Sequence, residues 1–141
     1  MARRKKNSER ASKWHGVRPG DIFVHSKTSK ATWLVVDAET PESPFSALAI
    51  GMNSFLGDCV TISHQNNIYV FQSVHLSMLE DIVTVRLTAY GQLFALGDDI
   101  VAMSIGGTFS LSGQPRPRPR KTQLVQLVKI TLSDPKLVYT A

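Results

Sequence analysis

The sequence predicts a mainly β protein, built as one small barrel or sandwich. Three observations support this fold class. The 141-residue chain contains about eight to ten short apolar segments, spaced at roughly 8–12 residues. These segments are rich in β-branched and aromatic residues, and clusters of Gly, Pro, Asn, Asp and Ser separate them. At most one or two short segments show helical periodicity, which argues against alternating β-α-β units.

Residues 17–39 are predicted to form a β-hairpin that begins the β domain. Pro19-Gly20-Asp21 is a turn signal, because Pro fixes φ, Gly tolerates positive φ and Asp can bond its own backbone. Ile22–Val24 is a short apolar run. Thr32–Val36 is β-branched or aromatic at nearly every position. That composition suits a strand that is covered on both faces.

The middle of the chain is predicted to add further strands and one helix. The strands are expected at 45–52, 59–63 and 68–72. Cys59 lies on an alternating strand, and we expect it to be a small buried core residue. The helix is expected at Ser73–Asp81, where Ser73 can cap it and Val74, Met78 and Leu79 share one stripe.

The last third of the chain is predicted to complete the β domain. Strands are expected at 82–89, 100–105, 108–111 and 123–132, with 137–139 as an edge strand. Residues 90–96 fit a helix or a strand equally well.

The charge distribution divides the chain into three parts. Residues 1–18 carry seven Lys or Arg against one acid, a net charge of +6. Residues 19–114 carry three Lys or Arg against nine acidic residues, a net charge of −6. Residues 115–141 carry six Lys or Arg against one acidic residue, a net charge of +5. We therefore predict a disordered basic arm at 1–16 and a β domain at 17–141 with a basic Pro-Arg loop at 115–121. Basic segments on an acidic domain indicate that these segments contact any polyanion.

The Pro-Arg loop has the sequence PRPRPRK. Alternating prolines favour polyproline II, whose rise of about 3.1 Å per residue places successive arginines about 6.2 Å apart. Guanidinium groups bind phosphates bidentately, and a stiff backbone lowers the entropy lost on binding. A solvated linker is the alternative interpretation. We favour polyanion binding because the N-terminal arm has the same sign.

These features predict a non-enzymatic protein that binds nucleic acid, RNA more than DNA, through largely sequence-independent phosphate contacts. The hydroxyl-rich loop 25–30 of the first hairpin is expected to assist. The expected contact residues are Arg3, Arg4, Lys5, Lys6, Arg10, Lys13, Lys27, Lys30, Arg116, Arg118, Arg120 and Lys121. A nuclear-localisation signal and a solubilising tail are the other interpretations of the arm.

The remaining composition predicts neither a metal nor a cofactor nor a catalytic group. No pair among His15, His25, His64 and His75 has metal-ligand spacing, and Cys59 has no companion cysteine. A single cysteine and the lack of an apolar stretch after the basic N-terminus predict an intracellular protein of the cytoplasm or nucleus. Membrane insertion is not expected, because no apolar run approaches the roughly 20 residues that span a bilayer.

Two resemblances extend these predictions. Residues 17–22 (VRPGDI), followed by Trp33–Val36, resemble the first two strands of SH3-like barrels, which include nucleic-acid-binding modules and the MazF-like toxin ribonucleases. This resemblance favours an SH3-like barrel and implies endoribonuclease activity as one alternative, with Lys27 and Lys30 standing where the toxins use an arginine. A basic N-terminal arm on a β domain also resembles small viral coat proteins. That layout implies, as the other alternative, a compact jelly-roll-like sandwich that self-associates on nucleic acid in a virion.

Overall fold

A computed structural model of the chain describes residues 16–37, 46–51, 57–62, 65–84, 90–105, 107–120 and 122–141. The described residues form one antiparallel sheet of ten strands and contain no helix. The strands are β1 (Ile22–Val24), β2 (Ala31–Val36), β3 (Ser46–Gly51), β4 (Cys59–Thr61), β5 (Ile68–Thr84), β6 (Leu93–Leu96), β7 (Asp99–Ser104), β8 (Gly107–Ser110), β9 (Pro115–Arg116) and β10 (Leu124–Tyr139). The expectation of a mainly β protein is confirmed.

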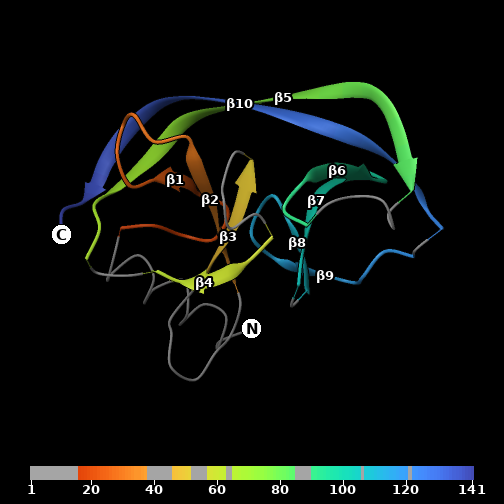
Figure 1. Cartoon of the computed structure of the whole chain (residues 1–141), viewed down its shortest axis with the longest axis horizontal. Helices are drawn as coiled ribbons and strands as arrows, with labels where there is room; N and C mark the ends of the chain where they lie inside the picture. Colours follow the sequence, from red (N-terminus) through yellow and green to blue (C-terminus); the bar gives the residue numbers. More distant parts are fainter. Residues whose placement is uncertain are drawn as a thin grey trace.

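The long antiparallel pair β5–β10 is the centre of the sheet, whose order is β4-β3-β2-β1-β5-β10-β6-β7-β8-β9. In Figure 1 this pair runs along the top of the view, with β1–β4 below one end and β6–β9 below the other. Each group joins the pair over a short stretch: β1 pairs with Tyr69 and Val70, and β6 pairs with Gln126 and Leu127. Among the described residues the sheet is open, since β4 and β9 each pair with one neighbour only. The choice between an SH3-like barrel and a sandwich stays a prediction.

Residues 73–81 belong to β5, so the predicted helix is wrong. The apolar side chains Val74, Leu76 and Met78 alternate along a strand, and they lie opposite Leu132, Ile130 and Val128 of β10. Pairing with a distant strand thus overrides a local pattern that also fits a helix. β10 likewise joins the predicted strands 123–132 and 137–139 into one, although Asp134 between them has a φ of 60°.

The hydrophobic core lies on both faces of β2. Trp33 and Val35 belong to a cluster formed mainly by β1–β4, together with Ile68 and Val70 of β5. Leu34 and Val36 belong to a second cluster that reaches across to the other half of the sheet. Its members are Ile22, Leu34, Val36, Leu48, Ile50, Leu93, Ala102, Phe109 and Val128. The expectation that this strand is covered on both faces is therefore confirmed, and the second cluster holds the two halves together.

A close backbone approach at Gly113 also joins the two halves. Gly113 follows β8 and has a φ of 83°. A Cβ atom there would lie 2.5 Å from the carbonyl oxygen of Val35 and 2.6 Å from the backbone nitrogen of Gly20. The carbonyl oxygen of Gly113 accepts a hydrogen bond of 2.7 Å from the backbone N–H of Asp37. Only glycine fits this position without movement of the backbone.

Cys59 is exposed, so the prediction of a buried core residue is wrong. All three residues of β4 are exposed, because this strand is the edge of the described sheet. Partial desolvation by neighbouring protein atoms, followed in effect by the charge of Asp58, raises the pKa of the Cys59 thiol to about 11. The thiol is therefore protonated at neutral pH and is a weak nucleophile there.

Candidate nucleic-acid interface

The Pro-Arg segment is held at both ends rather than being a loop throughout. Pro115 and Arg116 form β9 and pair with Phe109 and Thr108 of β8. Proline is compatible with this position because β9 is an edge strand of the sheet. Residues 117–120 continue without regular structure, and the backbone N–H of Gln123 then donates a hydrogen bond of 3.1 Å to the Arg120 carbonyl. The prediction of a loop is wrong for the first two residues.

The three arginines of this segment line one shallow groove with a volume of about 350 Å³. The groove is lined by Leu96, Asp99, Val101, Arg116, Pro117, Arg118, Pro119, Arg120 and Gln123. Arg118 and Arg120 are exposed, and their guanidinium groups form no hydrogen bond or ion pair with another described residue. Both cations are therefore available to an anion that enters the groove.

Arg116 differs from its two neighbours because it forms an ion pair. Its Nε donates to Oδ2 of Asp99 at 2.8 Å, and its Nη1 donates to the carbonyl oxygen of Pro115 at 3.1 Å. The two charged side chains are 39% and 40% exposed, so the pair contributes only about 0–1 kcal/mol. Its main effect is geometric: it fixes the start of the Pro-Arg segment beside the first residue of β7.

The tip of the first hairpin carries two more exposed cations, Lys27 and Lys30. The predicted hairpin is confirmed, since β1 pairs with β2 in antiparallel register. A turn shapes the tip: the backbone N–H of Ser29 donates to the Ser26 carbonyl at 3.1 Å, and the N–H of Ala31 donates to the Ser29 hydroxyl at 3.2 Å. Short local bonds therefore keep both lysines on one protruding loop.

The structure does not bring this tip and the Pro-Arg groove together. The tip belongs to the half of the sheet formed by β1–β4, and the groove belongs to the half formed by β6–β9 (Figure 1). Gly16, where the described part begins, approaches Val138 of β10 closely. The predicted contact residues Arg3, Arg4, Lys5, Lys6, Arg10, Lys13 and Lys121 lie outside the described residues, so their roles stay predictions.

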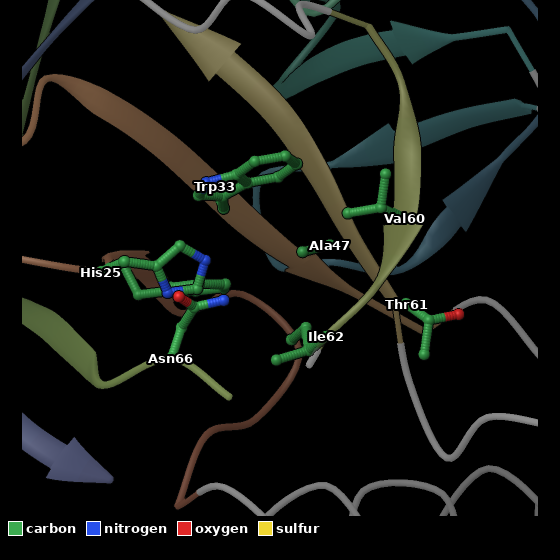
Figure 2. A pocket seen from close by; sticks show the side chains of 8 residues that line it. His25, Trp33, Ala47, Val60, Thr61, Ile62 and Asn66 are labelled. Atoms are coloured by element: carbon green, nitrogen blue, oxygen red, sulfur yellow. The ribbon is translucent and has the colours of Figure 1, made fainter. Parts of the chain in front are cut away.

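A second cavity, which was not predicted from the sequence, lies beside the hairpin (Figure 2). It has a volume of about 160 Å³. The described residues that line it come from β1–β4, from positions next to β1 and β4, and from the turn before β5: Phe23, His25, Trp33, Ala47, Val60, Thr61, Ile62 and Asn66. The rings of Phe23 and His25 meet edge to face, with centroids 5.5 Å apart, and the His25 and Trp33 centroids are 6.4 Å apart. Three aromatic rings thus form one wall of the cavity.

A backbone contact fixes the tautomer of His25. Nδ1 lies 2.9 Å from the carbonyl oxygen of Asn67. A carbonyl can only accept, so Nδ1 carries the proton and Nε2 of the neutral ring is an acceptor. Within the described part of the chain, Nε2 has no hydrogen-bond partner. The cavity therefore contains an acceptor that can bind a donor group of a ligand.

Other chemistry finds little support in the described residues. No three His, Cys, Asp or Glu side chains gather there in a group that could hold a metal ion. No helix among these residues is long and apolar enough to cross a membrane. Comparisons with protein-family models, with curated proteins and with solved structures found no match to this chain.

Proposed function

We propose that this protein binds nucleic acid, RNA in preference to DNA, without catalysing a reaction. The Pro-Arg segment and the basic N-terminal arm are its two phosphate-binding elements. One observation carries the proposal: Arg118 and Arg120 are exposed and lack an acidic partner among the described residues, in a groove that Arg116 fixes to the sheet. Anchored arginines lose less conformational entropy on binding a phosphate than arginines on a flexible tail do.

The binding should depend strongly on salt, because each neutralised phosphate releases counterions. For single-stranded nucleic acid, the slope of log K against log salt is about −0.7 per phosphate contact. Loss of Arg118 and Arg120 together should therefore make the slope shallower by about 1.4.

The test is a fluorescence-anisotropy titration of labelled single-stranded RNA over a range of salt concentrations. The variant is Arg118→Ala with Arg120→Ala. The matched control is Lys129→Ala with Lys136→Ala, which removes two exposed cations from β10. We expect weaker binding and a shallower slope in the first variant only. Equal slopes in the wild type and the arginine variant would refute the role of the groove.

A second candidate function is self-assembly on nucleic acid, as in a viral coat or another virion component. Val74, Leu76 and Met78 form a row on one face of β5, exposed by 43%, 37% and 53%. Beyond Val70, residues 71–80 have no strand partner among the described residues on the side away from β10. β5 also lacks the lysine and proline residues that commonly protect a strand edge.

Such an edge can pair with the same strand of a second copy in an antiparallel, two-fold arrangement. Light scattering with and without RNA tests this candidate function, with Leu76→Lys as the variant. We expect a concentration-dependent mass that the variant lowers. A monomeric mass for the wild type under both conditions would refute self-assembly.

A further inference from the structure

The geometry points to a nucleobase site: the cavity lined by His25, Trp33 and Asn66 binds one unpaired base, and Lys27 and Lys30 contact the adjoining phosphates. This inference rests on the proposed function and adds a single-stranded specificity to it. In Figure 2 His25 and Asn66 lie at the left of the cavity, Trp33 lies above it, Val60 lies to the right and Ile62 lies below.

The walls of the cavity suit a flat aromatic ring. Phe23 and Trp33 are almost completely buried and are held rigidly by the core, whereas His25 is half-buried at the rim. Ala47 and Ile62, which belong to the same core cluster as Phe23 and Trp33, add apolar surface to the cavity. Phe23 supports the site from within the core, whereas the half-buried ring of His25 and the 8% exposed ring of Trp33 are the surfaces on which a base can stack. Such stacking depends little on the identity of the base, because every base has a π face.

The polar groups of the cavity suit the edge of a base. Nε2 of His25 is an acceptor, and the Asn66 amide offers a donor and an acceptor on the same side of the cavity. A base edge carries ring N–H or amino donors beside carbonyl or ring-nitrogen acceptors. The two sets of groups are therefore complementary.

The charge around the cavity distinguishes a base from a cationic ligand. Aromatic cages also bind quaternary ammonium groups through cation–π contacts. None of the described residues that line this cavity is acidic, and the exposed ammonium groups of Lys27 and Lys30 lie on the loop that follows His25. These lysines repel a cation and attract the phosphates that accompany a nucleobase.

The probe is a labelled five-nucleotide single-stranded RNA, compared with the same backbone without bases. The base-bearing probe should bind the wild type about 5- to 150-fold more tightly than the abasic probe, the range expected from one stacked base. His25→Ala and Asn66→Ala should reduce this ratio. The exposed position of Asn66 makes it the safer variant for folding, and circular dichroism checks both. Arg118 and Arg120 lie in the other half of the sheet, so in an Arg118→Ala, Arg120→Ala background His25→Ala and Asn66→Ala should still weaken binding of the base-bearing probe.

The outcomes separate this inference from the proposed function. Salt-dependent binding with equal affinity for the two probes would overturn the nucleobase site and leave phosphate binding intact. A normal ratio in both His25→Ala and Asn66→Ala would overturn it as well. No binding of either probe would overturn the nucleobase site and the proposed function together.

Discussion

The substitution Gly113→Ala tests whether the two halves of the sheet depend on one close backbone contact. The new Cβ atom would lie 2.5 Å from the Val35 carbonyl oxygen and 2.6 Å from the Gly20 nitrogen. These two atoms are themselves joined by a hydrogen bond of 2.8 Å, so neither can move without disturbing the first hairpin. The hydrogen bond from Asp37 to the Gly113 carbonyl would also be strained.

Two terms give the expected loss of stability. A residue with a Cβ at positive φ costs about 1–2 kcal/mol. Displacing the backbone weakens one or two hydrogen bonds, each worth about 1 kcal/mol net. The sum is about 3 kcal/mol, which for a chain of this size lowers Tm by roughly 10–15 °C.

The matched control is Gly97→Ala. Gly97 has a φ of 63°, yet a Cβ there would meet no atom within 4 Å. This control therefore measures the conformational cost alone, at about 1–2 kcal/mol. Urea denaturation and thermal melting followed by circular dichroism measure both variants. A loss in Gly113→Ala no larger than that in Gly97→Ala would refute the argument that close approach makes Gly113 essential.

Three further substitutions or reactions probe charged and titratable groups. A double-mutant cycle of Arg116→Gln and Asp99→Asn, measured by urea denaturation, should give a coupling free energy below about 1 kcal/mol, because both side chains are partly exposed. A larger coupling free energy would contradict the mainly geometric role of this ion pair. Cys59, with a thiol pKa of about 11, should react slowly with iodoacetamide at neutral pH and faster as the pH rises towards 11; rapid alkylation at neutral pH would count against this. Burial raises the pKa of Asp21 above 3.8. Its carboxyl therefore contributes stability that is fully present below pH 3.8 and is lost as the pH rises through the raised pKa. The Asp21→Asn variant should thus have at least the wild-type free energy of unfolding in urea at pH 7, and it should lose this advantage as the pH falls towards 4. A variant that is less stable than the wild type by the same amount at both pH values would contradict the upward direction of the pKa shift.

The sequence predicted those strands whose local pattern has one interpretation. Thr32–Val36 is apolar at nearly every position, and β2 is buried on both faces. The prediction of a helix at residues 73–81 was wrong because the apolar residues there fit both a helical stripe and the alternation of a strand. These residues are Val74, Leu76, Met78 and Leu79. Only the register with β10 distinguishes the two patterns, and that register depends on residues about 50 positions further along the chain.

The two candidate sites also differ in whether a local sequence pattern reveals them. Arg116, Arg118 and Arg120 were found from the sequence because their spacing is local and needs no tertiary information. The cavity at His25, Trp33 and Asn66 was missed because its lining residues become neighbours only through the pairing of β1, β2, β3 and β4. A hydroxyl-rich loop between an apolar run and a tryptophan was the one local signal, and it indicated the lysines rather than the cavity.

The separation of the two basic surfaces has a consequence for how nucleic acid would bind. The groove and the hairpin tip lie in different halves of the sheet, so a strand must extend from one half to the other to occupy both (Figure 1). Two strands that are too short to do so would bind independently, and substitutions in the two sites would act on separate binding events. A strand long enough to reach both sites would bind the second one intramolecularly, at a high effective concentration. Affinity should therefore rise steeply at one strand length, and this rise should vanish when either Arg118 and Arg120 or His25 and Asn66 are replaced by alanine.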